Sequence, residues 1–206
     1  MISGFFAQKP HLEKETQHYR GIVSALVSAI EVLDSCTEGH GKRVSDFSTS
    51  LARRLGLEAA EVSEISTASL LHDIGKLGVP SEILLKPAGL DRDEYDLVKK
   101  HPEYSARILS QVHGFEYIVD LALRHHERYD GMDYPDGLAG DAIPLGAQII
   151  QLADCFDDMT SSRSCRPALS LGLATRDIRE ESGRQFNYAV AEAAIEIFAE
   201  RRAGRG

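Results

Sequence analysis

Residues 62–80 read VSEISTASLLHDIGKLGVP, and within them a helical pattern gives way to a turn. Apolar side chains recur at three- and four-residue steps, at Val62, Ile65, Ala68 and Leu71. This is the spacing of one face of an amphipathic helix. Two glycines and a proline follow Asp73, and these residue types end helices. The sequence therefore predicts a helix that stops near His72 and Asp73, beside a loop that forms one wall of a candidate site.

The same helical spacing extends to both sides of this stretch. It predicts helices over residues 19–33, 44–55, 118–125 and 145–156, and two last helices over 169–181 and 187–201. Asp91 and Glu94 form a D-x-x-E capping box that opens a short helix, and His101-Pro102 ends that helix. Glycine and proline predict an ordered loop over residues 129–146. No alternating strand pattern is present, so the predicted fold class is all-α.

Length and composition predict a single domain. The 206 residues are 43% hydrophobic and 27% charged, which is ordinary for a globular protein. Residues 1–18 show no sustained period and are expected to form an N-terminal arm or linker before a catalytic domain over 19–206. The formal charge of −9 argues against bulk affinity for nucleic acid or an anionic membrane. Three cysteines without a CxxC motif, and no leader or long apolar run, favour a cytoplasmic location.

Histidines and carboxylates gather where the predicted helices end. Five of the eight histidines lie at such ends or breaks: His40, His72, His101, His125 and His126. Together with Asp73 and Asp154 they are ligands that divalent iron, manganese and zinc accept. Neighbouring residues in a regular helix diverge by about 100°, so adjacent ligands share a site only where the helix is ending. A lone histidine is more often a hydrogen-bonded structural residue than a metal ligand. The prediction of a metal site therefore rests on the whole pattern and not on any one histidine.

The order and intervals of these residues resemble the HD-GYP family of HD-superfamily metal-dependent phosphohydrolases. The resemblance covers about residues 33–187 and includes HDIGK at 72–76, HHERYDGMDYPDGL at 125–138 and ADCFDDMTSSRSCR at 153–166. It implies an HD-superfamily helical bundle with a binuclear metal centre in its core, holding two divalent ions, iron or manganese. It also implies hydrolysis of cyclic di-GMP or a related cyclic dinucleotide.

Carried over residue by residue, the resemblance implies that one metal binds His40, His72, Asp73 and Asp154. The second metal then binds the shared Asp73 with His101, His125 and His126. A hydroxide that bridges the metals opens cyclic di-GMP to linear pGpG, and further cleavage to GMP is left open. Asp73 and Lys76 are the candidate catalytic residues. The candidate substrate-binding residues are Lys76, Tyr134, Arg163 and Arg166.

Each substrate-binding candidate also has an ordinary structural reading. Guanidinium groups suit phosphate geometry, although Arg163 and Arg166 are equally compatible with an exposed loop. Tyr134 either contacts substrate or pins its loop onto the core. Glu127 is expected to hold this loop and the metal ligands rather than to touch substrate.

Two positions depart from the family pattern. Asp133 stands where the first glycine of the GYP signature is usual, giving DYP, and it is expected to adopt the positive φ that glycine supplies there. Cys36 lies four residues before His40, where some members carry a glutamate for a third metal. A thiol is a poor substitute for that carboxylate, so two metals are expected rather than three.

Two alternatives to the cyclic di-GMP enzyme remain. One is a low-activity signalling module that acts by binding a ligand or a protein, and the other is a hydrolase of a different nucleotide, such as a mixed cyclic dinucleotide. The complete set of seven ligands favours an enzyme, because a decaying site usually loses a ligand first. The expected partner is a cyclic dinucleotide, without nucleic acid or membrane. A signalling protein partner and a homodimer are left open.

Overall fold

The computed structural model describes residues 21–30, 39–86, 88–161 and 167–203. Residues 21–30 form a helix. The elements that follow are α2 (His40–Arg54), α3 (Ala59–Leu71), the 3₁₀ helix η2 (Ile74–Gly78), α4 (Ser81–Leu84), α5 (Arg92–Val98), α6 (His101–Leu109), α7 (Glu116–Arg124), η3 (Gly140–Ala142), α8 (Leu145–Thr160), α9 (Leu171–Glu180) and α10 (Tyr188–Ala203). No strand occurs in these residues, only an isolated bridge between Ser182 and Phe186. The predicted all-α class is confirmed.

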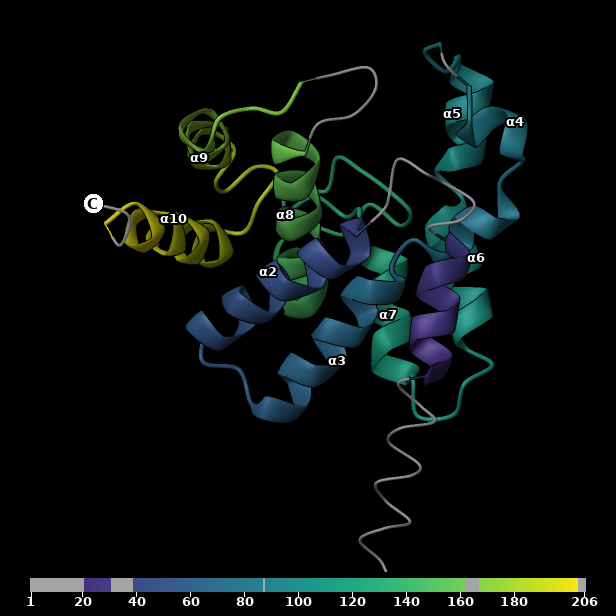
Figure 1. Ribbon diagram of the computed structural model, residues 1–206, viewed down its shortest axis with the longest axis horizontal. Coiled ribbons are helices and arrows are strands. Elements are labelled where there is room, and N and C mark those ends of the chain that lie inside the picture. Colours follow the sequence, from purple (N-terminus) through teal and green to yellow (C-terminus); the bar gives the residue numbers. More distant parts are fainter. Residues whose placement is uncertain (1–20, 31–38, 87, 162–166, 204–206) are drawn as a thin grey trace, which may run out of the picture.

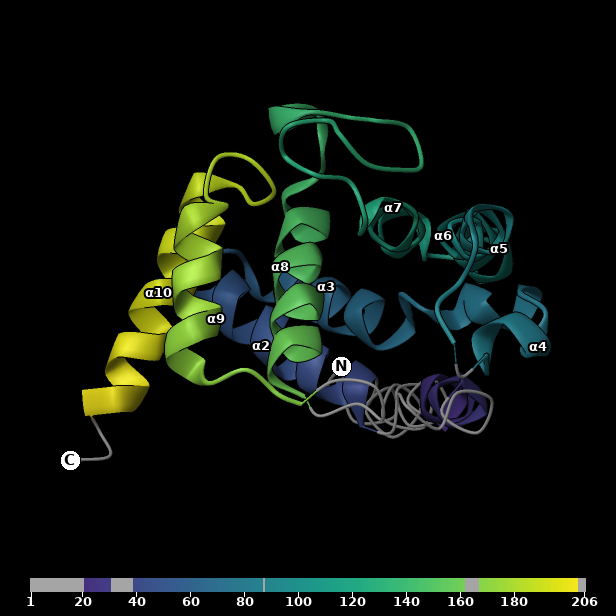
Figure 2. The same ribbon diagram turned by 90° about the horizontal axis from the view of Figure 1, so that it is seen from above.

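Helix α8 is the axis of the bundle. It stands between α9 and α10 on one side and α7 on the other (Figures 1 and 2). Helices α2 and α3 pack against each other and against α8, while α6 packs on η2 and α7. The interface contains fully buried apolar side chains from four helices, including Leu51, Ile65, Leu121 and Ile149. Burying such side chains is the main favourable term in folding, and here it fixes the ends of α2, α3, α6 and α7 around α8.

The helix boundaries follow the sequence signals. Helix α3 ends at Leu71 and His72 is its C-cap, as the glycines after Asp73 predict. At the start of α5, the Glu94 amide donates to Asp91 Oδ1 (2.9 Å) and the Asp91 amide donates to Glu94 Oε2 (2.9 Å). This is the predicted capping box. Pro102 lies in the first turn of α6, where a missing N–H has no cost.

The structure corrects two sequence predictions, and some other predictions concern residues outside those that it describes. The four-residue helix α4 was not predicted, and α8 continues to Thr160 rather than ending near residue 156. The arm over residues 1–18, Cys36, Arg163 and Arg166 lie outside the described residues. Within the described part of the chain, every helix is too short or too polar to cross a membrane.

Candidate metal centre

The seven predicted ligands come from the ends of four helices and the middle of a fifth. His40 opens α2, His72 and Asp73 follow α3, His101 opens α6, and His125 and His126 follow α7, whereas Asp154 lies within α8. A residue that follows a helix no longer has to diverge by about 100° from its neighbour. The His72-Asp73 and His125-His126 pairs can therefore each turn into one site.

The first group contains His40, His72, Asp73 and Asp154. His40 Nε2 lies 3.2 Å from Asp154 Oδ1 and 3.9 Å from Asp73 Oδ2. His72 Nε2 lies 3.5 Å from Asp73 Oδ2 and 3.9 Å from Asp154 Oδ1. Ligand atoms of His40, His72 and Asp73 all lie within 4.8 Å of one another, a spacing compatible with one ion between them.

The second group contains His101, His125 and His126, whose ligand atoms also lie within 4.8 Å of one another. Asp73 connects it to the first group, because Oδ1 of Asp73 lies 3.3 Å from His101 Nε2 while Oδ2 faces His40 and His72. The two oxygens of one carboxylate thus serve different halves of the site. This is the arrangement required of a carboxylate that bridges two cations.

Hydrogen bonds to the other ring nitrogen orient the histidines. Nδ1 donates to a main-chain carbonyl in three of them, His72 to Ser69 (2.7 Å), His101 to Val98 (2.8 Å) and His125 to Ala122 (2.7 Å). A carbonyl oxygen only accepts, so Nδ1 carries the proton and Nε2 of the neutral ring keeps its lone pair. Each of these rings therefore turns the lone pair of Nε2 toward the centre, where the Nε2 atoms of His101 and His125 lie 3.2 Å apart.

The donor set fits a pair of divalent cations. His72 Nε2 is buried without a hydrogen-bond partner, a costly state that coordination to a cation would relieve. Burial lowers the pKa of His125 and lowers that of His126 to about 3, so both rings are in the neutral form that binds metals. Burial also lowers the pKa of His40, but Asp154 and Asp157 outweigh it and raise that pKa to about 10. The first group therefore strongly attracts positive charge.

Lys76 lies at the edge of the centre. Its Nζ is 2.6 Å from Asp73 Oδ2 and its side chain is 19% exposed. Burial raises the pKa of Asp73, but Lys76 and His72 outweigh it and hold that pKa well below its usual range. Asp73 is therefore ionised, and Lys76 brings a positive charge next to the carboxylate that faces both groups.

The loop after α7 lies against the second group. The ring of Tyr134 stacks on that of His126, with centroids 4.8 Å apart and planes 26° apart. The buried carboxylate of Glu127 accepts the amides of Asp136 (2.8 Å) and Leu138 (3.0 Å). These bonds agree with the part of the prediction in which Glu127 holds the loop. No non-glycine residue of the described chain has a positive φ, so the positive φ expected at Asp133 is wrong. In this loop Gly131 and Gly137 have positive φ instead.

Two residues that support the ligands, Asp157 and Ser105, are not predicted from the sequence. Asp157 Oδ2 accepts a hydrogen bond from His40 Nδ1 (2.8 Å). Ser105 Oγ donates to the His72 carbonyl (2.7 Å) and accepts from the Gly75 amide (2.8 Å). Asp157 could have been found, because it follows Asp154 by three positions and residues at this spacing share a helix face. Nothing in the sequence pattern singles out Ser105.

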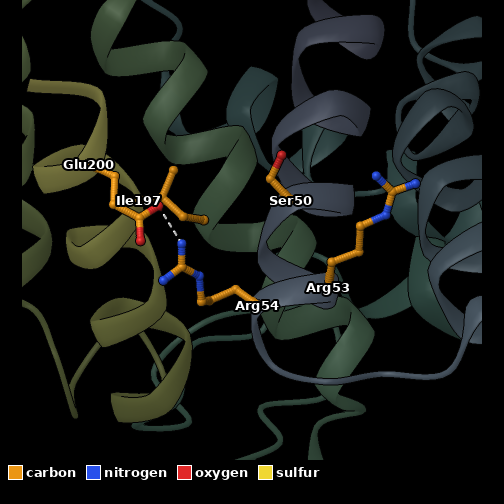
Figure 3. Close-up of a pocket in the computed structure, with 5 residues that line it drawn as sticks. All are labelled: Ser50, Arg53, Arg54, Ile197 and Glu200. Atoms are coloured by element: carbon orange, nitrogen blue, oxygen red, sulfur yellow. Dashed lines mark hydrogen bonds and ion pairs between the residues drawn. The ribbon is translucent and has the colours of Figure 1, made fainter. Parts of the chain in front are cut away.

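One hollow borders the centre, and another lies apart from it. One is lined by Val27, Ile30 and Leu70 together with His40, Gly41, His72 and Asp73, so the helix over residues 21–30 covers part of the first group. The other, of about 630 Å³, lies between the C-terminal ends of α2 and α10, where Arg54 pairs with Glu200 (Figure 3). Arg54 also pairs with Glu196. Its lining contains none of the seven candidate ligands.

Comparison with known proteins agrees with this geometry. The model of the family described as HD domain matches residues 6–190. The chain belongs to the HD domain family. This HD domain is 40% identical over 178 residues to the cyclic di-GMP phosphodiesterase response regulator RpfG of Xanthomonas campestris pv. campestris, covering 85% of the chain and 47% of that protein. It is 36% identical over 170 residues to the 3'3'-cGAMP-specific phosphodiesterase 3 of Vibrio cholerae, covering 82% and 37%.

Solved structures share the fold. The HD domain superposes with a TM-score of 0.63 and 18% identity on Bd1817, an HDG"Y"P protein from Bdellovibrio bacteriovorus, covering 86% of the chain and 60% of that structure. With the cyclic GMP-AMP specific phosphodiesterase V-cGAP3 of V. cholerae the TM-score is 0.55 at 30% identity, covering 87% and 40%. The predicted family is confirmed, whereas the DYP variant of the signature stays a prediction. The chain spans about half or less of the length of these curated relatives.

Proposed function

We propose that this HD domain is a metal-dependent phosphodiesterase that hydrolyses cyclic di-GMP to linear pGpG. The observation that carries the proposal is the shared carboxylate: Asp73 presents one oxygen to the His40 and His72 pair and the other to His101. The names of the relatives, cyclic di-GMP phosphodiesterase and cGAMP-specific phosphodiesterase, support the same class of reaction.

In this proposal His40, His72, Asp73 and Asp154 would hold the first metal ion, and Asp73, His101, His125 and His126 would hold the second. Iron or manganese suits this mixture of imidazole and carboxylate ligands. Two such ions, when bound, lower the pKa of water and neutralise charge on a phosphodiester.

The chain's own residues bind and orient the substrate. The ammonium of Lys76 and the guanidinium groups of Arg163 and Arg166 offset the two phosphate charges in a protein whose net charge is −9. Tyr134 offers its ring or hydroxyl to the dinucleotide beside His126. In the reaction a water oxygen bonds to phosphorus, the bond from phosphorus to the 3' oxygen breaks, and a proton passes to that leaving oxygen.

A mixed cyclic dinucleotide is the second candidate substrate. It is favoured by the relatives from V. cholerae that are named 3'3'-cGAMP-specific phosphodiesterases. Both substrates present the same phosphodiester bonds, so the metal centre does not discriminate between them, and selection has to come from contacts with the bases.

One experiment tests the function. The purified protein is stripped with a chelator, reloaded with Mn²⁺ or with Fe²⁺ under anaerobic conditions, and analysed for metal and for products from cyclic di-GMP and 3'3'-cGAMP. Two metal equivalents with pGpG as product support the proposal, and the chromatogram also shows whether GMP follows. Two equivalents without any product would instead favour a signalling module, and a protein that takes up no metal would rule out the proposed centre.

The remaining predictions complete the proposal. An arm or linker over residues 1–18 precedes a catalytic domain over 19–206, and the enzyme acts in the cytoplasm. The net charge of −9 argues against a nucleic acid held by a basic surface. It favours instead a small anionic ligand held by a few local positive groups.

A further inference from the structure

Asp157 joins a metal-ligand candidate to a surface cation. It lies in α8 and is 6% exposed. Its Oδ2 accepts from His40 Nδ1 (2.8 Å) and from Arg43 Nη2 (3.0 Å). Its Oδ1 accepts from Arg43 Nε (2.6 Å) and from Ser161 Oγ (3.2 Å). The carboxylate is therefore held from two helices, α2 and α8, and leaves His40 little freedom to turn.

His40 differs from the other oriented histidines in the chemistry of this partner. His72, His101 and His125 donate Nδ1 to main-chain carbonyls of Ser69, Val98 and Ala122, whereas His40 donates to an ionised side chain. A carboxylate partner orients the ring and makes its other nitrogen a stronger donor. His40 thus has a support that the three carbonyl-bonded rings, including His72 of its own group, lack.

We propose that Asp157 is a positioning residue for the first metal, which holds His40 with Nε2 toward Asp154 and sets the affinity of that position independently of the second. This inference rests on the metal centre of the proposed function. His40 Nε2 lies 3.2 Å from Asp154 Oδ1, so a rotation of the ring would remove it from the first group. Among the described residues, the hydrogen bonds of the Asp157 side chain go to His40, Arg43 and Ser161, so the three histidines of the second group should keep their positions when Asp157 is replaced.

Arg43 has a different part. Its Nε and Nη2 form a fork on Asp157, a strong and geometrically specific pairing, and its side chain is 47% exposed. Arg43 therefore steadies the carboxylate from the surface, whereas the bond from His40 Nδ1 goes directly to Asp157. Replacing Arg43 tests the bridge between α2 and α8 while the bond to His40 is kept.

The test titrates the metal-free protein with Co²⁺, whose visible absorption reports its ligands. In Asp157→Asn we expect the first Co²⁺ position to weaken about 10–100-fold and the second to keep its native affinity, so that one equivalent remains at a concentration that fills both native positions. Arg43→Gln should keep both equivalents. Asp46→Asn, an exposed aspartate of α2 paired with Lys42, is the matched control and should also bind two.

A purely structural role makes the opposite prediction. If Asp157 only holds α2 against α8, Asp157→Asn and Arg43→Gln should lower the melting temperature alike and both should still bind two Co²⁺ with native affinity, which would overturn the inference. Loss of the first ion to the same extent in both variants would overturn it too. A native protein that binds no Co²⁺ would instead overturn the proposed function.

A second measurement covers the case in which Asp157→Asn does not fold. Nitrogen-15 spectra of histidine-labelled native protein, with Zn²⁺ as a diamagnetic probe and His40→Gln for assignment, report which ring nitrogen of His40 carries the proton. The inference requires the proton on Nδ1 and a Zn²⁺-induced shift of the Nε2 signal. A proton that stays on Nε2 after Zn²⁺ is added would contradict it.

Discussion

Asp73 is the residue on which both halves of the centre depend. Its two oxygens face different groups of histidines. Two cations a few ångströms apart repel each other strongly in a buried site, and a shared anion is what offsets this. We therefore expect Asp73→Ala to lose both metal equivalents, measured by elemental analysis after gel filtration.

The control for this change is Asp141→Ala, which removes an exposed aspartate in η3 and should retain both equivalents. His101→Ala should lose the second metal with less effect on the first, because the first group keeps all of its ligands. Two full equivalents of metal in Asp73→Ala would refute the bridging assignment.

Lys76 should affect substrate more than metal. Its ammonium lies on the bridging carboxylate, beside the place proposed for the phosphates. We expect Lys76→Ala to lower kcat/KM by an amount that corresponds to about 1–3 kcal/mol of lost transition-state stabilisation, the range for a charge-assisted hydrogen bond. Its metal content should be unchanged. Lys42→Ala, which removes an exposed lysine of α2 paired with Asp46, should keep native kinetics. A Lys76→Ala protein with native kinetics would show that the ammonium serves Asp73 alone.

At the scale of elements, the contact between η2 and α6 brings the two groups of ligands together. A methyl group added at Gly75 would lie 1.9 Å from the His101 carbonyl oxygen and 2.4 Å from the Ser105 amide nitrogen, so the backbones have to separate. We expect Gly75→Ala to destabilise the fold by about 1–3 kcal/mol or more, as overpacking does, and to reduce metal affinity because Asp73 moves away from His101.

Gly172→Ala is the matched control for that change, since its added methyl would meet nothing closer than 4.0 Å and alanine favours a helix such as α9. Thermal unfolding and metal titration of both variants are the measurements. If Gly75→Ala keeps both native values, the close approach of η2 and α6 is not what positions Asp73.

The loop over residues 131–138 is a second element with a testable anchor. Glu127 accepts the Asp136 and Leu138 amides through different oxygens, so Glu127→Gln replaces one acceptor by a donor and leaves an amide unpaired. We expect a loss of about 1–3 kcal/mol in stability and a higher KM, with native metal content. Glu103→Gln, on the exposed side of α6, should change neither quantity. An unchanged KM in Glu127→Gln would separate this loop from substrate binding.

Sequence patterns predict the parts of the site that local chemistry determines. The glycines after Asp73 and the Asp91 capping box predict helix ends that the structure confirms, because caps and turns depend on neighbouring residues. The Asp157 bond to His40 and the Ser105 bond to His72 join residues far apart in sequence. No local pattern specifies such pairs, and they require the packed bundle. The prediction of a positive φ at Asp133 was wrong, because Gly131 and Gly137 are the residues of this loop that have a positive φ.

At the scale of the whole molecule, the candidate ligands come from α2, α3, α6, α7 and α8, so a metal ion that needs ligands from several of these helices binds the folded chain only. Such binding stabilises by mass action, by about 2.7 kcal/mol at a free concentration 100 times Kd. For a chain of this size each kcal/mol raises Tm by about 2–4 °C, so Mn²⁺ should raise the Tm of the metal-free protein by about 5–10 °C and excess chelator should reverse the shift. Asp73→Ala should show no shift in either direction. Equal Tm values for the native protein in chelator and in Mn²⁺ would mean that the bundle is complete without the ions, and that they do not bind the five ligand-bearing helices as one site.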